Sequence, residues 1–256
     1  MDLELKNKTA LVLASTRGLG YGCAKILSSE GVKVVINGRN NDIGVESAGV
    51  LGNGVQFIKA DLSNSKERNQ LFIKTREILG DINILVLNGD SPESGTFINK
   101  SIEDWQQAIE QVMFPAIDLI KKCITTMEKN KFGRIINISS ISAKEISKDL
   151  ALTSGLKPGL IGVLSSLARE VAPYGITINS ILPGPFNTDL LKKYLYQNKN
   201  IKNSKDLELY KNNIPVNRLG TIEEFGSLCT FLCSPLAGYI TGQSIAIDGG
   251  KFNSIF

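Results

Sequence analysis

A glycine-rich segment near the start of the chain has the pattern of a phosphate-binding turn. Residues 10–13 form an apolar run of strand length, and Tyr21 to Glu30 shows the apolar spacing of a helix. A strand that turns sharply into a helix directs unpaired N–H groups and the positive end of the helix dipole at one point, which suits a pyrophosphate. Gly18 and Gly20 allow close approach of a ligand because they carry no Cβ. An ordinary strand–helix turn with two glycines has the same pattern. The predicted dinucleotide-binding turn consists of Ala14, Ser15, Thr16, Arg17, Gly18, Leu19 and Gly20.

Two arginines near this turn favour a phosphorylated cofactor. An acidic residue about 20 residues after the glycines binds a ribose 2′-hydroxyl, whereas an arginine accommodates a 2′-phosphate. The second strand-like run ends in Gly38, Arg39 and Asn40 without an acidic residue, and Arg17 lies inside the turn. Guanidinium groups match phosphate geometry and stay charged. Arg17, Arg39 and Asn40 therefore predict NADP; the alternative is two solvated surface arginines.

The absence of histidine restricts the available proton chemistry. None of the 256 residues is a histidine, which excludes Ser–His and Cys–His nucleophiles and histidine metal sites. Lys, Tyr, Asp, Glu or a relay of hydroxyls and water must move any proton. The chain has four cysteines and no CxxC pair. Cys229 and Cys233 lie four residues apart, which in an apolar helix indicates core packing more often than a metal pair. No metal is predicted.

Composition predicts a cytoplasmic protein that binds neither nucleic acid nor membrane. The net charge is +4, with scattered Lys and Arg, and 42% of the residues are hydrophobic. No apolar run reaches the roughly 18–20 residues that a membrane span needs. Residues 1–8 are polar and charged, so no secretory signal is expected.

Strand-like runs alternate with helix-length segments along the whole chain. This alternation predicts one domain of the α/β class, a doubly wound parallel sheet (Rossmann fold) of about seven strands with helices on both faces. The expected strands are Thr9–Ala14, Lys33–Asn37, Val55–Ala60, Asn83–Asn88, Arg134–Ser139, Thr177–Leu182 and Ser244–Ile247. The expected helices lie near Gly18–Ser29, Ile43–Leu51, Lys66–Leu79, Ile102–Lys129, Leu152–Val171 and Ile222–Cys233.

One polar segment, residues 186–213, interrupts this alternation. It follows the sixth strand, and insertions after the carboxyl ends of strands lie over the ligand crevice in such folds. We therefore expect a mobile substrate lid, although a surface helical excursion without a role fits as well. Five lysines in or near the lid mildly favour an anionic substrate or carrier, and simple solvation of their charges is the other explanation; they are Lys192, Lys193, Lys199, Lys202 and Lys205.

Seven short motifs in order give the chain a family resemblance. It resembles the short-chain dehydrogenase/reductase family, in its 3-oxoacyl-carrier-protein reductase-like branch, almost from end to end. The motifs lie at Ala14–Gly20, Asp61–Leu62, Leu87–Gly89, Gly133–Ser140, Pro183–Thr188, Arg218–Glu224 and Asp248–Gly250.

The resemblance implies roles for individual residues. Asp61 and Leu62 would meet the adenine, and Asn88 and Gly89 would line its ribose side. Pro183, Gly184 and Thr188 would contact the nicotinamide end, and Lys157 would also bind the cofactor. The strand around Asp248 would lie in a subunit interface, so a homotetramer, or else a homodimer, is expected.

The active-site motif departs from the family pattern. The family uses a Ser, a Tyr-x-x-x-Lys on the following helix and an Asn on the preceding one. Ser140 and Lys157 match, whereas Thr153 stands at the Tyr position and Val112 at the Asn position. Ala14 stands where the family has the first glycine of the turn. The implied catalytic residues are Ser140, Thr153 and Lys157.

A threonine is a poor replacement for the phenol because its hydroxyl is far less acidic. Three alternatives remain. Lys157 could pass a proton through a water held by Thr153 and Ser140, giving a slow reductase. Another group could replace the tyrosine; the candidates are Tyr194, Tyr196, Lys144, Glu145 and Lys148. Alternatively, the protein binds NADP(H) as a sensor or partner subunit and performs little chemistry. For an enzyme, the resemblance implies a 3-oxoacyl thioester, a sugar or polyol, or a small ketone as substrate.

Overall fold

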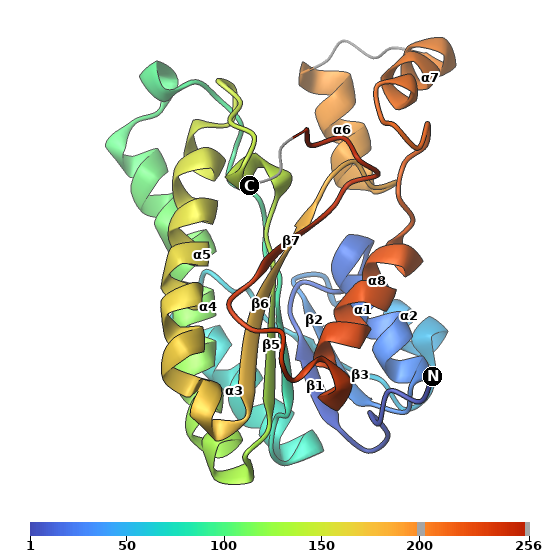
Figure 1. Ribbon diagram of the computed structural model, residues 1–256. Helices are drawn as coiled ribbons and strands as arrows, with labels where there is room; N and C mark the ends of the chain where they lie inside the picture. The colour runs from blue at the N-terminus through green and yellow to red at the C-terminus, as the bar shows by residue number, and fades with distance from the viewer. Residues whose placement is uncertain (199–202, 254–256) are drawn as a thin grey trace.

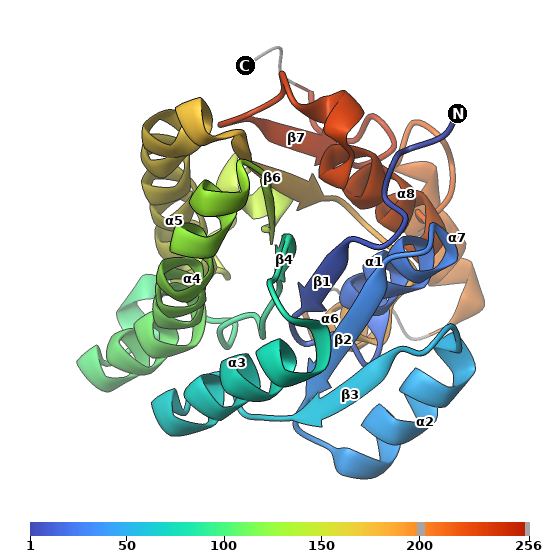
Figure 2. The same cartoon turned by 90° about the horizontal axis from the view of Figure 1, so that it is seen from below.

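The computed structural model describes residues 1–198 and 203–253. Seven parallel strands form one twisted sheet in the order β3-β2-β1-β4-β5-β6-β7, as Figures 1 and 2 show. The predicted doubly wound parallel sheet is confirmed. The strands are β1 (Thr9–Val12), β2 (Lys33–Gly38), β3 (Gln56–Lys59), β4 (Ile84–Leu87), β5 (Gly133–Ile138), β6 (Ile176–Pro183) and β7 (Ser244–Ile247).

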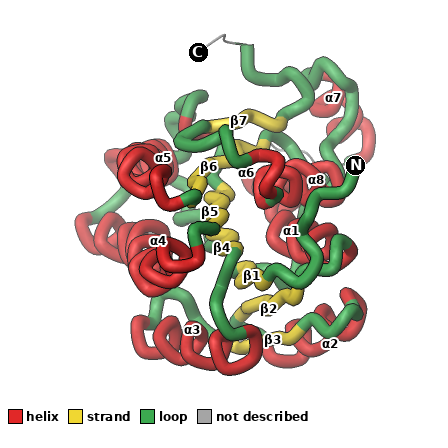
Figure 3. The backbone as a smooth tube through the Cα atoms, turned by 60° about the horizontal axis from the view of Figure 1, so that its bottom comes forward, coloured by secondary structure: helices red, strands yellow, loops and turns green. Residues whose placement is uncertain are grey.

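Helices cover both faces of this sheet, with α1, α2 and α8 on one side and α3, α4 and α5 on the other (Figure 3). The α-helices are α1 (Gly18–Ser29), α2 (Asn41–Leu51), α3 (Ser65–Leu79), α4 (Ile102–Asn130), α5 (Ala151–Val171), α6 (Asp189–Asn198), α7 (Ser204–Asn212) and α8 (Ile222–Cys233). Short 3₁₀ turns are η1 (Phe97–Asn99), η2 (Ile141–Ala143), η3 (Ala172–Tyr174) and η4 (Pro235–Ala237).

The strands alternate their side chains between two hydrophobic cores. On β1, Ala10 and Val12 pack into the core under α1 and α8, whereas Leu11 packs into the core under α3, α4 and α5. A strand buried on both faces reads as a continuous apolar run, which is why such strands were predictable.

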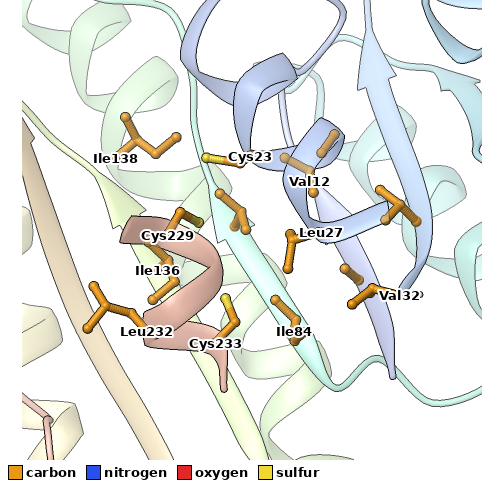
Figure 4. Packing of buried hydrophobic residues seen from close by; sticks show 14 of the residues in the cluster. Val12, Cys23, Leu27, Val32, Ile84, Ile136, Ile138, Cys229, Leu232 and Cys233 are labelled. Atoms are coloured by element: carbon orange, nitrogen blue, oxygen red, sulfur yellow. The ribbon is translucent and has the colours of Figure 1, made fainter. Parts of the chain in front are cut away.

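Helices α1 and α8 pack closely against each other because both have a glycine at their contact. A Cβ built on Gly226 would lie 2.3 Å from the carbonyl oxygen of Gly22, and one built on Gly22 would lie 2.3 Å from that of Ile222. The sulfur atoms of Cys23, Cys229 and Cys233 fill the core beneath this contact (Figure 4). All of the chain's cysteines are free and buried, in agreement with a packing role.

The segment predicted as a lid contains α6 and α7. Leu195 on α6 is buried, and Lys192 lies 3.9 Å from Asp189 across one turn. Lys199 and Lys202 lie outside the described residues. Among the residues that the structure describes, no helix is long and apolar enough to cross a membrane.

Candidate active site

The phosphate-binding turn follows β1 at the carboxyl edge of the sheet. The strand ends at Val12, earlier than predicted, because Ala14 has a φ of +43° and leaves the extended conformation. Asn88 after β4 donates a hydrogen bond of 2.9 Å to the Ala14 carbonyl. A Cβ built on Gly20 would lie 2.7 Å from Asn88 Nδ2, so this position requires glycine. Arg17, which precedes α1, makes no side-chain hydrogen bond to the first helical turn. The backbone donors of that turn therefore fit an anionic ligand.

Asn37 on β2 holds the turn in place. Its Oδ1 accepts from the Ala14 amide at 3.2 Å, and its Nδ2 donates to the Ala60 carbonyl at 3.0 Å. Ser15 is fully buried, and its hydroxyl donates to the Val12 carbonyl at 2.6 Å. The Ser15 side chain thus shapes the turn and lines neither cleft described below. Asn37 was missed from the sequence because it reads as an ordinary strand residue.

A pocket of about 1060 Å³ including its mouth, here called the adenosine pocket, opens beside the turn. Its lining includes most of the residues predicted for the adenosine half of the cofactor: Ala14, Thr16, Arg17, Arg39, Asn40, Asp61, Leu62 and Gly89, with Asp90 in addition. The Asn40 side chain accepts a hydrogen bond of 3.0 Å from the Ile43 amide and so caps the N-terminus of α2.

Two carboxylates of this pocket lie near Arg39. Arg39 Nη2 lies 2.8 Å from Asp90 Oδ2. Burial alone would raise the pKa of Asp61, but hydrogen bonds from the Ser63 hydroxyl and amide, together with the Arg39 charge, lower it below its usual value. The Asp61 carboxylate is therefore ionised near neutral pH, and the lining of the pocket combines arginine and aspartate side chains.

A second cleft, of about 1330 Å³ including its mouth, lies on the other side of the turn. We call it the substrate cleft. It brings together all three predicted catalytic residues, Ser140, Thr153 and Lys157. The predicted nicotinamide-side residues Pro183, Gly184 and Thr188 also line it. Leu19 of the turn and Asn88 line it too, although Asn88 was predicted for the ribose side of the adenine. Gly89 lines both the substrate cleft and the adenosine pocket, so the two spaces meet there.

Lys157 is the electrostatically unusual group of this cleft. Only 6% of the residue is exposed, and burial lowers the pKa of its ammonium to about 8. Its Nζ makes no hydrogen bond within the part of the chain that the structure describes. An amine with such a pKa exchanges protons readily near neutral pH.

The hydroxyl groups around Lys157 are only partly engaged. Ser140 Oγ accepts the Ser142 amide at 3.1 Å, which leaves its proton free to donate. Ser139 also lines the cleft, and its buried Oγ has no hydrogen-bond partner among the described residues. Ser139 was missed as a site residue because it reads as the last residue of a buried strand.

Lys157 also lines a small pocket with room for a water molecule. Val112 lines it where the family places an Asn. Pro115 lacks an N–H, so the Gln111 carbonyl loses its helical donor beside the same cavity. Asn137 is a further polar lining residue.

Of the five candidate replacements for the tyrosine, Tyr194 alone lines the substrate cleft. Tyr196 is 60% exposed. Lys144, Glu145 and Lys148 are exposed on the loop after β5 and do not contribute to the lining. The loops after β4 and β5 pair at Gly95 and Leu150, which closes the wall beside Thr153.

The sheet order, the glycine turn after β1 and the Ser–Lys pair after β5 define a short-chain dehydrogenase/reductase, and the chain belongs to that family. A family model described as Enoyl-(Acyl carrier protein) reductase matches residues 13–251.

The chain is 32% identical over 256 residues to the 3-oxoacyl-[acyl-carrier-protein] reductase FabG of Aquifex aeolicus, covering 98% of this chain and 100% of the relative. It is also 32% identical to the NADPH-dependent reductase BacG of Bacillus subtilis, covering 98% and 100%. Among solved structures, YwfH, an NADPH-dependent reductase involved in bacilysin biosynthesis, matches with a TM-score of 0.92 and 32% identity over 97% of this chain and 99% of that one. The protein is an oxidoreductase.

Proposed function

We propose that the protein is an NADP(H)-dependent oxidoreductase that interconverts a carbonyl and an alcohol, with Thr153 in place of the family tyrosine. The observation that carries this proposal is the meeting of two spaces at Gly89. An arginine-containing adenosine pocket lies on one side of the turn, and a cleft with Ser140 and Lys157 lies on the other.

The two arginines that line the adenosine pocket support NADP as the cofactor. The backbone of the turn would hold the pyrophosphate, and Arg17 and Arg39 would hold the 2′-phosphate. A curated relative and a solved structure that resemble this chain are named as NADPH-dependent reductases, which supports this choice. When bound, the nicotinamide supplies or accepts a hydride at the substrate carbon.

The residues of the substrate cleft would bind the carbonyl oxygen of the substrate and exchange a proton with it. The Ser140 and Thr153 hydroxyls donate hydrogen bonds to the carbonyl oxygen, which stabilises negative charge as it develops. Lys157, with a pKa of about 8, is mostly protonated at pH 7 and can donate a proton. It delivers a proton to that oxygen through a water between Ser140 and Thr153, and takes it back in the oxidative direction. Tyr194 is the alternative proton donor, since it lines the same cleft.

For the substrate we propose a 3-oxoacyl thioester, a sugar or polyol, or a small ketone. Apolar side chains of Leu150, Leu190 and Leu191 lie beside Lys193 in the cleft lining, a combination that accommodates an acyl chain with an anionic group. Leu190, Leu191 and Lys193 belong to residues 186–213, which we propose act as the lid. A homotetramer or homodimer is the proposed assembly, and light scattering would test it.

The first experiment is a calorimetric titration of the purified protein with NADPH and NADH, followed by a screen of carbonyl substrates. Micromolar binding of NADPH with much weaker binding of NADH, and NADPH consumption with a carbonyl, supports the proposal. Binding without turnover on any substrate favours a second function, an NADP(H)-binding sensor or partner subunit, for which the Thr153 substitution is the specific argument. If neither nucleotide binds, both functions are wrong.

A further inference from the structure

An ion pair crosses the adenosine pocket in front of the phosphate-binding turn. Arg39 follows β2 and Asp90 follows β4, and these two strands flank β1 in the sheet. A contact between the two loops must therefore pass the end of β1, where the turn begins. Arg39 Nη2 and Asp90 Oδ2 are 2.8 Å apart, and both residues line the pocket. The arginine proposed to hold the 2′-phosphate is already bound to a carboxylate of its own chain.

The charges that line this pocket balance. Arg17 and Arg39 contribute two positive charges, and Asp61 and Asp90 contribute two negative charges. A 2′-phosphate, which carries nearly two negative charges, would gain little from a neutral lining. It gains more if one carboxylate moves away from Arg39.

Asp90 is the carboxylate that is free to move. Its side chain is 57% exposed, and within residues 1–198 and 203–253 its one ion-pair partner is Arg39. Asp61, in contrast, accepts hydrogen bonds from the Ser63 amide at 2.9 Å and from the Ser63 hydroxyl at 2.7 Å. The Asp61 backbone amide also donates a hydrogen bond of 2.8 Å to the Glu67 carboxylate.

We propose that Asp90 is a cofactor-selectivity residue that competes with the 2′-phosphate of NADP for Arg39. The proposal rests on the proposed function. Binding of NADP exchanges the Asp90 carboxylate for the phosphate as the partner of Arg39. NAD carries no phosphate at this position and leaves the ion pair in place. Asp90 thereby lowers the preference for NADP over NAD that Arg39 alone would give.

The test uses ligands that occupy only the adenosine half of the site. Adenosine 2′,5′-bisphosphate and adenosine 5′-diphosphate are titrated calorimetrically into the wild-type protein and into Asp90→Asn. We expect the bisphosphate to bind about fivefold more tightly to the variant, which is the fold-change that an exposed ion pair of about 1 kcal/mol represents. The diphosphate should change by less than about twofold.

A matched control separates pairing from general charge. Asp42 is exposed on the first turn of α2, three residues after Arg39, and makes no ion pair with it among the described residues. Asp42→Asn removes the same charge and should leave the ratio of the two affinities unchanged. In an Arg39→Ala background, Asp90→Asn should have no effect on the bisphosphate.

Three results would overturn the proposal while the wild-type protein still binds the bisphosphate. These are an unchanged or weaker bisphosphate affinity in Asp90→Asn, an equal gain for both ligands, or a gain that persists without Arg39. If the wild-type protein binds neither these ligands nor NADPH, the proposed function itself fails, and this proposal fails with it.

Discussion

Thr153 precedes Lys157 by one turn of α5, and both side chains are buried in the wall of the same cleft, each residue 6% exposed. The Thr153 hydroxyl and the Lys157 amine therefore line the same cleft as Ser140. Thr153 and Lys157 occupy the positions of the family's tyrosine and lysine. The first variant to make is therefore one that restores the phenol at position 153.

Thr153→Tyr should raise carbonyl reductase activity by about 10²-fold, because a positioned acid contributes about 10²–10⁴ to a rate. NADPH oxidation at saturating substrate measures the effect. Thr153→Phe, which adds the ring without the hydroxyl, is the control and should show no gain. Equal rates for the two variants would mean that the cleft has been rebuilt around a different acid.

Lys157→Met should stabilise the protein below pH 8. At that pH the lysine is protonated in both the folded and the unfolded chain, and burial of the charge destabilises the fold. The lowering of the pKa from 10.5 to about 8 corresponds to about 3 kcal/mol. Between pH 8 and 10.5 the folded chain has released the proton while the unfolded chain still holds it, so the stability of the wild-type protein rises with pH.

Urea unfolding of both proteins at pH 7 and at pH 10 measures this difference. The advantage of Lys157→Met should shrink as the pH rises toward 10.5. A gap that is constant with pH would show that Lys157 titrates normally. The same variant should have little or no catalytic activity.

Arg39→Asp should weaken NADPH about 10- to 100-fold, since a charge-assisted hydrogen bond contributes about 1.5–3 kcal/mol. The affinity for NADH should fall much less, because NADH carries no 2′-phosphate. Quenching of protein fluorescence or calorimetry gives both dissociation constants. Equal losses for NADPH and NADH would contradict the assignment of Arg39 to the phosphate.

Gly226→Ala should lower the free energy of unfolding by about 1–3 kcal/mol, because its Cβ would overlap the Gly22 carbonyl of α1. Gly162→Ala on α5 is the matched control. No atom lies within 4 Å of the Cβ that it would add, and alanine favours a helix over glycine by about 1 kcal/mol. Denaturant unfolding compares the two variants, and a loss of equal size in both would contradict the role of the α1–α8 contact.

The sequence was a reliable guide wherever local pattern decides structure. The strands are buried on both faces and so appear as apolar runs, and the helix caps at Asn64 and Thr221 follow ordinary capping chemistry. Ser140 and Lys157 were placed in one site by the family resemblance, and both line the substrate cleft of the structure.

Features that depend on the path of loops could not be predicted. Arg39 and Asp90 meet because two loops converge over β1, and neither residue type nor spacing indicates this pairing. Asn37 supports the turn from within a strand. The early end of β1 depends on the left-handed conformation of Ala14, which sequence patterns assign to glycine.

The glycine contact between α1 and α8 also has a consequence for how the chain folds. Lys25 and Glu223, on the same two helices, form a 2.8 Å ion pair between residues 198 positions apart. During synthesis, the phosphate-binding turn and α1 emerge long before α8 exists. The part of α1 that packs on α8 therefore has no partner until residues 222–233 have been made, whereas the part that faces β1 and β2 can be covered much earlier.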